Sequence, residues 1–182
     1  MAVKILTYNN ALQVEPFVKS IIDIYRVAFG QAPYFKNEAE VRAFTAIFPR
    51  HMLRPGFRCV VACEEETRAI LGFAYGYTGA AKQWWHDLVV QKMTPEEAED
   101  WMTDVFEVVE LAVYPAAHGH GYGGRIHDAL LQGLPHRTAV LSTYQVETNA
   151  MKMYEKRGWV TLLSDFIFPG YSEPYKIMGK LL

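Results

Sequence analysis

Residues 105–134 constrain the fold of this chain more than any other stretch of its sequence. An apolar, Val-rich run covers 105–113 and stops before Pro115, which predicts a buried strand. Helical spacing of apolar residues then runs over 125–134. Between them lie four glycines, at positions 119, 121, 123 and 124. A strand, a glycine turn and a helix N-terminus together form an anion site, because unpaired backbone N–H groups can approach the ligand closely. The sequence therefore predicts a phosphate or pyrophosphate ligand.

The spacing of these glycines also fits a dinucleotide-binding turn. Gly119, Gly121 and Gly124 match the pattern G-x-G-x-x-G, which is a weak signal on its own. Such a site places the turn early in the chain and an acidic residue about 20 residues later, at the end of the next strand. Here the turn comes late, and the next predicted strand, 138–143, is followed by no carboxylate before Glu147. A nicotinamide-linked oxidoreductase therefore fits the sequence poorly.

Two motifs in this region resemble the GNAT acetyltransferase superfamily. The first is Glu-Leu-Ala-Val-Tyr-Pro at 110–115 followed by His-Gly-His-Gly-Tyr-Gly at 118–123. Its glycine part resembles the family signature (Gln/Arg)-x-x-Gly-x-(Gly/Ala), which binds the pyrophosphate of coenzyme A. The second motif is Ala-Met-Lys-Met-Tyr-Glu-Lys-Arg-Gly-Trp at 150–159, which resembles the segment Ala-x-x-x-Tyr-Glu-Lys-x-Gly-Phe. Together the two motifs cover 105–160 and follow the family's order.

The resemblance implies that the chain binds acetyl-coenzyme A. It assigns the pantetheine arm and the thioester carbonyl to the strand backbone, and the pyrophosphate to the glycine turn. The implied cofactor residues are Leu111, Ala112, Val113, His118, Gly119, His120, Gly121, Tyr122, Gly123, Gly124 and Asn149. His118 stands where the family usually has Gln or Arg, and Glu147 stands where it often has Asn. Asn149 and Thr148 are also natural N-caps for the helix that follows them.

Tyr154 is the candidate general acid, because the resemblance places this residue near the sulfur of coenzyme A. A phenol, with a pKa near 10, is suited to protonating a departing thiolate. The position of Tyr154 in a short helix also fits a buried packing residue.

Glu107 and Glu110 are the candidate general bases. A lysine-type amine is protonated at neutral pH and must lose a proton before it attacks a thioester, either directly to a carboxylate or through a water. The two carboxylates are three residues apart, so a regular strand points them to opposite faces, and we expect only one to act. Either one also fits a strand carboxylate that is solvated or paired with a cation.

The remaining elements indicate an α/β fold. Predicted strands cover 3–8, 57–63, 69–77, 105–113, 138–143, 159–166 and 173–180, and predicted helices cover 14–29, 38–48, 123–134 and 149–157. The strands 57–63 and 69–77 flank a short polar segment and predict a hairpin. This order fits a GNAT-like single domain over residues 1–182, with a mixed, mostly antiparallel central sheet flanked by helices.

Composition excludes several classes of protein. The hydrophobic fraction of 51% and charged fraction of 21% are typical of a soluble globular protein. A net charge of −2 and a pI near 6.3 argue against a nucleic-acid partner, which requires a basic face. No apolar run approaches the roughly 18 residues of a membrane span, and the first residues lack the apolar core of a signal peptide. We therefore expect a cytoplasmic protein with no membrane partner.

The metal-ligating residue types are sparse. Cys59 and Cys63 lie four residues apart in one strand, roughly 13 Å, which is too far for a disulfide. They fit two buried thiols in a reducing compartment. His118 and His120 have no third ligand nearby in the sequence. We expect no metal.

Residues 80–104 are the candidate substrate lid. They contain the aromatic residues Trp84 and Trp85, and residues 96–110 hold seven acids with no Lys or Arg, which would attract a cationic amine. Thr94, Pro95 and Glu97 also form a helix-start pattern, so a solvated helix accounts for the acids equally well.

Together these observations predict an N-acetyltransferase. It would move an acetyl group from acetyl-coenzyme A to a small-molecule or peptide amine by direct attack, without a covalent enzyme intermediate. A homodimer is compatible with the sequence. The alternatives are a non-catalytic acyl-coenzyme A sensor or partner-binding module, and the NAD-linked oxidoreductase described above.

Overall fold

The computed structural model describes residues 2–182 and has an α/β architecture. The chain forms two compact units, each built from two separate stretches. The first unit holds the described residues up to Tyr77 together with Glu110–Gln132, and the second holds Thr78–Val109 together with Gly133–Leu182. The boundaries fall inside two strands, which therefore belong to both units.

The first unit contains the hairpin and most of the long helices. Its elements are β1 (Val3–Tyr8), α1 (Ala11–Val14), a 3₁₀ turn η1 (Glu15–Phe17), α2 (Val18–Phe29), α3 (Glu38–His51), β2 (Arg58–Glu64), most of β3 (Ile70–Gly79), the end of β4 (Val105–Val113), a 3₁₀ turn η2 (Pro115–Ala117) and α6 (Tyr122–Leu131). The second unit contains the start of β4 and the remaining elements. These are α4 (Trp84–Val90), α5 (Pro95–Met102), β5 (Thr138–Tyr144), α7 (Asn149–Lys156), β6 (Val160–Phe166) and β7 (Tyr175–Leu181).

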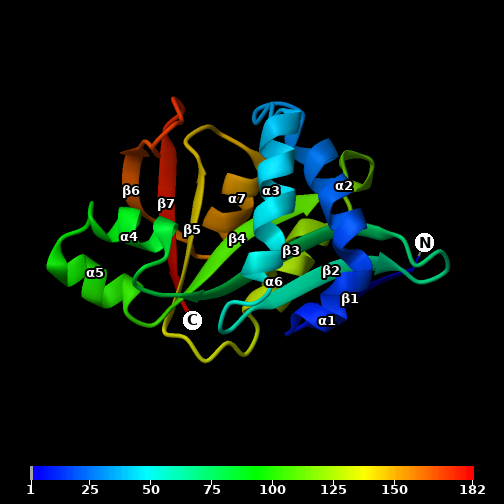
Figure 1. The fold of residues 1–182 in the computed structure, drawn as a ribbon, viewed down its shortest axis with the longest axis horizontal. Helices are drawn as coiled ribbons and strands as arrows, with labels where there is room; N and C mark the ends of the chain where they lie inside the picture. The colour runs from blue at the N-terminus through cyan, green and yellow to red at the C-terminus, as the bar shows by residue number, and fades with distance from the viewer. Residues whose placement is uncertain (1) are drawn as a thin grey trace. The chain divides into compact units, whose positions relative to one another are not determined.

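Seven strands of the described chain are hydrogen-bonded in the order β1-β2-β3-β4-β5-β7-β6 (Figure 1). The pairs β1–β2, β2–β3, β5–β7 and β6–β7 are antiparallel, whereas β4 and β5 pair in parallel. A parallel pair needs a crossover connection, which in this chain contains α6. The predicted mixed, mostly antiparallel sheet flanked by helices is confirmed.

Two predicted helix boundaries are wrong. The helix predicted from residue 14 is divided into α1, η1 and α2, because Pro16 has no N–H to donate and its ring crowds the preceding turn. The helix predicted to reach residue 134 ends at Leu131, two residues before Gly133, which has φ +65°, and four before Pro135. A left-handed glycine is the usual signal that stops a helix.

Stacked aromatic side chains form the core of the first unit beneath α2 and α3. Tyr25 stacks on Phe44 with ring centroids 3.9 Å apart, and Phe44 also stacks on Phe48 and Phe73. Burial of each such side chain contributes about 2–3 kcal/mol. α3 begins with a capping box in which the Asn37 side chain accepts from the backbone of the first turn.

The predicted hairpin is formed by β2 and β3, and it carries both cysteines. Cys59 and Cys63 are buried free thiols, as the sequence predicts. Burial raises the pKa of the Cys59 thiol well above its ordinary value, so the thiol stays protonated and unreactive.

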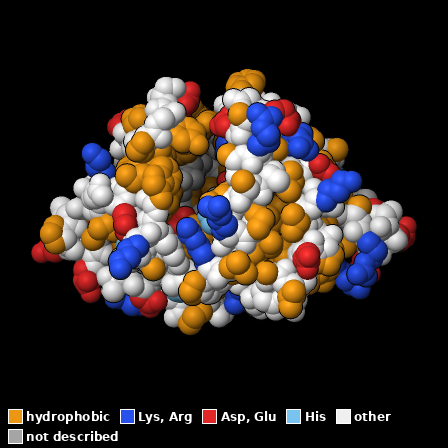
Figure 2. All heavy atoms as spheres, viewed as in Figure 1, with side chains coloured by type: hydrophobic (Ala, Val, Ile, Leu, Met, Phe, Trp, Pro, Cys, Tyr) orange, Lys and Arg blue, Asp and Glu red, His pale blue; other side chains and the backbone are white. Residues whose placement is uncertain are grey.

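Residues 80–104 fold into α4 and α5 and pack on the second unit. Val89 and Met102 enter its apolar core, and the Trp85 indole N–H donates to Ser142 Oγ at 3.2 Å. The predicted cap of α5 is confirmed, because Thr94 and Glu97 form a capping box with Pro95 in the first turn. The α5 acids, Glu96, Glu97, Glu99 and Asp100, are exposed; Figure 2 shows acidic side chains on this surface. This favours the solvated-helix interpretation, and the lid stays a prediction.

Candidate active site

The glycine turn of the first unit is open and has an uncapped helix behind it. Gly119 has φ +82° and Gly121 has φ +74°, in the left-handed region that favours glycine. A Cβ added at either position would meet nothing within 4 Å. Gly121 is the N-cap of α6, and no described side chain caps that helix. The first N–H groups of α6 and the space beside the turn are therefore suited to an anion.

His118 and His120 brace this turn. The His118 Nε2–H donates to the carbonyl oxygen of Val113 at 3.0 Å, and the His120 Nδ1–H donates to that of His118 at 3.0 Å. Because a carbonyl oxygen can only accept, these two nitrogens carry protons and are not metal ligands. Among residues 2–182, His, Cys, Asp and Glu side chains form no group of three or more that could hold a metal ion.

Gly72 lets the end of β4 and a side chain of α6 lie close to β3, a role that sequence reasoning missed. A Cβ at Gly72 would lie 2.9 Å from the carbonyl oxygen of Ala112 and 3.1 Å from Ile126 Cδ1. A glycine inside a strand pattern often marks such a close approach, and that signal was present in the sequence. The end of β4 and the first turns of α6 therefore pack directly on β3.

Arg58 fixes the opposite end of α6. Its Nη1 donates to the carbonyl oxygens of Leu130 at 3.2 Å and Gln132 at 2.7 Å. A cation is favourable at a helix C-terminus, where unpaired carbonyls and the helix dipole are negative. Arg58 therefore supplies donors at the C-terminus of α6, whereas the N-terminus of α6 has no side-chain cap.

Glu110 is half-buried, and its surroundings perturb its pKa. Burial raises the pKa of the carboxyl, and the Lys36 ammonium partly opposes that shift. Lys36 is held by aromatic side chains: its Nζ donates to Tyr25 Oη at 2.6 Å and lies 5.0 Å from the ring centroid of Phe29. A carboxylate that is reachable and has a raised pKa fits a general base.

Glu107 and Tyr154 lie in the second unit and are more deeply buried, with exposed fractions of 4% and 6%. Glu107 is the last β4 residue in the parallel ladder with β5, opposite Val140. Tyr154 lies in α7 with its ring centroid 5.7 Å from that of Trp159. This buried, packed position is compatible with both interpretations of Tyr154, because a packing residue and a general acid each need a ring held in one orientation.

Thr148, and not Asn149, is the N-cap of α7. Thr148 Oγ1 accepts from the backbone N–H of Met151 at 3.0 Å, while Asn149 is the first helical residue and is exposed. Of the two N-caps that the sequence predicts, Thr148 is therefore confirmed and Asn149 is wrong. Glu147 forms a surface ion pair with Lys152 at 2.7 Å.

The structure thus brings together one group of predicted residues in each unit. Leu111, Ala112, Val113 and the turn residues His118 to Gly124 share the first unit with Glu110. Glu107, Asn149 and Tyr154 share the second unit. In sum, the fold and the turn define an α/β protein in which an open glycine turn precedes a helix N-terminus without a side-chain cap.

Sequence comparison identifies the family. The model of the acetyltransferase (GNAT) family matches residues 18–159, and the chain belongs to that family. A GCN5-like protein acetyltransferase of Mycobacterium tuberculosis, Rv2170, is 33% identical over 129 residues. That alignment covers 66% of this chain and 63% of the relative, so the chain matches less than two thirds of the relative's length.

Solved structures share the fold at low sequence identity. PH1933 from Pyrococcus horikoshii is 18% identical, with a TM-score of 0.66 over 100% of this chain and 99% of that one. An aminoglycoside 6'-acetyltransferase type Ii is 15% identical, with a TM-score of 0.65 over 97% and 96%. The PaiA N-acetyltransferase from Thermoplasma acidophilum, solved in complex with coenzyme A, is 13% identical, with a TM-score of 0.66 over 100% of both chains.

In the described part of the chain, residues 2–182, no helix has both the length and the apolar character needed to cross a membrane.

Proposed function

We propose that this protein is an N-acetyltransferase that moves the acetyl group of acetyl-coenzyme A to an amine by direct attack. The observation that carries the proposal is the glycine turn. Its left-handed glycines leave open space next to an uncapped helix N-terminus, which fits the pyrophosphate of coenzyme A. Membership of the GNAT family and the coenzyme A complex of the PaiA enzyme support the same ligand.

The cofactor would be held mainly by backbone groups. Gly119 to Gly124 would offer N–H donors to the pyrophosphate, while His118 braces the turn through Val113. The backbone of Leu111 to Val113 would bind the pantetheine arm and polarise the thioester carbonyl. Coenzyme A supplies the acetyl thioester, and the chain supplies orientation and proton transfer.

Glu110 is the proposed general base. The acceptor ammonium must lose a proton before its nitrogen can attack, and burial raises the pKa of the half-buried Glu110 carboxyl, which makes its carboxylate a stronger base. Lys36 opposes that rise and so helps to keep Glu110 ionised. Glu107, which is nearly fully buried, is the second candidate for the base.

Tyr154 is the proposed general acid. The C–S bond of the thioester breaks as the C–N bond forms, and the leaving thiolate takes up the phenolic proton. Packing against Trp159 restricts the ring, so its hydroxyl would be held in one place. Asn149, freed from a capping role, would contact the cofactor. The acceptor would be a small-molecule or peptide amine, and the two buried free thiols suit a reducing cytoplasm.

Thermal unfolding with acetyl-coenzyme A, and separately with NAD, tests the proposal. At about 100 times its Kd a ligand stabilises the folded state by roughly 2.7 kcal/mol, which raises Tm by roughly 5–10 °C. We expect this shift with acetyl-coenzyme A alone, followed by release of coenzyme A thiol with a panel of amines. Binding of acetyl-coenzyme A without thiol release on any amine would identify a non-catalytic sensor instead. A Tm shift with NAD alone would contradict both the acetyltransferase and the sensor hypotheses.

A further inference from the structure

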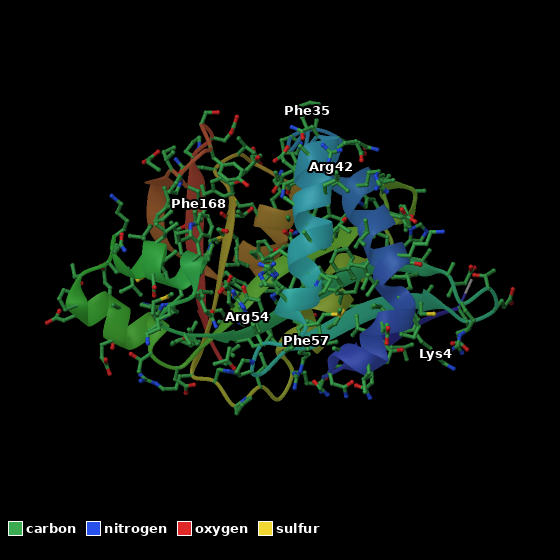
Figure 3. All side chains as sticks on the ribbon, in the orientation of Figure 1. Lys4, Phe35, Arg42, Arg54, Phe57 and Phe168 are labelled. Atoms are coloured by element: carbon green, nitrogen blue, oxygen red, sulfur yellow. The ribbon has the colours of Figure 1, made fainter. Side chains whose placement is uncertain are left out.

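Arg54, just beyond the last turn of α3, is a half-buried cation on an aromatic face. Its guanidinium carbon lies 4.4 Å from the ring centroid of Tyr77 on β3. Figure 2 shows basic side chains on the surface at this end of α3, and Figure 3 labels Arg54 there, with Arg42 towards the opposite end of the helix. The side chain is therefore partly shielded from water and supported by Tyr77.

The donors of Arg54 have no acceptor in the described chain. No carboxylate among residues 2–182 lies within ion-pair distance of Arg54, and no described group accepts a hydrogen bond from its guanidinium. Two other arginines of the first unit, Arg26 and Arg58, do have acceptors. Arg26 pairs with Asp23 at 2.8 Å and with Glu38 at 3.0 Å, and Arg58 donates to backbone carbonyls. The planar guanidinium of Arg54 therefore has N–H donors available to a ligand.

A titratable side chain, that of His51, is close to Arg54. His51 lies beside it, with Nδ1 2.9 Å from Tyr75 Oη and its ring centroid 5.0 Å from that of Tyr77. Burial and the nearby Arg54 lower the pKa of His51 to about 4, so the imidazole is neutral at pH 7. His51 therefore adds no charge of its own beside the Arg54 guanidinium at neutral pH.

Stacking also determines which ligand suits this cation. A guanidinium lying on a ring exposes its edge, and that edge matches the two oxygens of a carboxylate in a bidentate pair. A pair formed in a partly desolvated place is stronger than one on an open surface.

This position is separate from the pyrophosphate turn. Arg58, four residues after Arg54, contacts the C-terminal end of α6, roughly 15 Å along the helix from its N-terminus. Tyr77 likewise lies five residues along β3 from Gly72, roughly 17 Å, and Gly72 is the β3 residue that packs against the end of β4 and α6. Pyrophosphate at the turn would therefore leave Arg54 available for a second anion.

We infer that Arg54, supported by the ring of Tyr77, is a carboxylate-binding subsite of this protein. The assignment of that carboxylate to the acceptor rests on the proposed acetyl transfer. The acceptor is then an amine that also carries a carboxylate, such as an amino acid or the C-terminal end of a peptide. Arg54 selects it by binding the carboxylate, at a distance from the nitrogen that reacts.

Matched acceptor pairs test the inference. Thiol release is measured with L-amino acids and with the corresponding amino-acid amides, in which an uncharged carboxamide replaces the carboxylate. We expect the wild-type protein to prefer the acids, and Arg54→Gln to raise KM for the acids 10–100-fold with little change for the amides. Arg54→Lys, which keeps the charge and loses the fork, should fall between them. Arg50→Gln removes an exposed arginine from the last turn of α3 and should leave both KM values unchanged.

A binding measurement separates this inference from the proposed function. Thermal shifts with N-acetyl-L-amino acids and N-acetyl-amino-acid amides, both with coenzyme A present, need no turnover. We expect the acids to stabilise the wild-type protein and to lose that effect in Arg54→Gln, whose Tm without ligand is measured first. Absence of thiol release with a retained, Arg54-dependent acid shift would refute acetyl transfer and keep the subsite. Equal shifts for acids and amides, or equal shifts in both proteins, would overturn the subsite.

Discussion

The two units carry their candidate groups in opposite ways. In the first unit the glycine turn would act through its backbone, and a Cβ placed at Gly119 or Gly121 would enter open space. In the second unit Tyr154, the proposed acid, would act through a side chain that is almost fully buried and packed against Trp159. The first arrangement suits holding a ligand, whose binding needs space and donors. The second suits chemistry, which needs a group held in one orientation.

This difference indicates what each kind of substitution should do. Changes in the turn should weaken cofactor binding and leave the chemical step intact in whatever complex still forms. Changes to the side chains should slow the chemical step and leave cofactor binding intact. A turn variant that slowed the chemical step, or a side-chain variant that weakened cofactor binding, would show that the comparison is wrong.

Tyr154→Phe should have the largest effect. Loss of the proton donor should lower kcat by roughly 10²–10⁴, with little change in affinity for acetyl-coenzyme A. Steady-state thiol release gives kcat, and calorimetric titration gives the affinity. Tyr175→Phe removes a hydroxyl from another aromatic cluster of the same unit and should keep kcat. An unchanged kcat in Tyr154→Phe would reduce Tyr154 to a packing residue.

Glu110→Gln should lower kcat/KM by a similar factor, roughly 10²–10⁴, and should also stabilise the protein at pH 7. Burial raises the folded-state pKa of Glu110, so the folded state favours the protonated carboxyl. The wild-type protein therefore loses stability as pH rises from the unfolded-state pKa, about 4.3, through the folded-state value. The variant avoids this loss, and its advantage in Tm should disappear below about pH 4.

Glu107→Gln is the matched control for the base. It removes a carboxylate from the same strand, at a position that is more buried and lies in the ladder with β5. If Glu110 is the base, the activity loss and the pH-dependent gain in Tm should both follow Glu110→Gln. A larger activity loss in Glu107→Gln would transfer the role to the second unit.

Local signals in the sequence predicted the elements well. Strand and helix positions follow the spacing of apolar residues, and the structure reproduces nearly all of them within a few residues. The glycine turn was also predictable, because a left-handed φ favours glycine, and glycines are visible in the sequence. The errors arose where proline or glycine interrupted an apolar pattern, as at Pro16 and Gly133.

Side-chain environments were not predictable, because they depend on residues far apart in the chain. The Arg58 contact with α6 spans 72 residues, and the Lys36 charge near Glu110 comes from a loop before α3. The Arg54 subsite similarly joins the end of α3 to β3. A single sequence shows which residues the chain contains, but it does not show which distant residues are in contact after folding.

Gly121→Ala should weaken binding of acetyl-coenzyme A about 10–100-fold. The loss corresponds to a hydrogen bond to a charged group, worth about 1.5–3 kcal/mol, and the added Cβ enters the space of the ligand. Gly133→Ala is the matched control, since Gly133 also has a positive φ, +65°, and nothing within 4 Å of an added Cβ. Both variants should lose about 1 kcal/mol of stability from backbone strain. Equal loss of affinity in the two would show that strain, and not contact with the ligand, is responsible.

The smallest expected effects separate structure from ligand contact at the start of α7. Thr148→Ala removes the N-cap and should cost about 1 kcal/mol, or a fall in Tm of about 2–4 °C for a protein of this size. Asn149→Ala removes an exposed side chain that caps nothing and should change stability by less than about 0.5 kcal/mol. If Asn149 contacts coenzyme A, only its variant should bind the cofactor more weakly in calorimetric titration. Unchanged affinity in Asn149→Ala would leave cofactor binding to the backbone, and the contrast between the two units would become sharper.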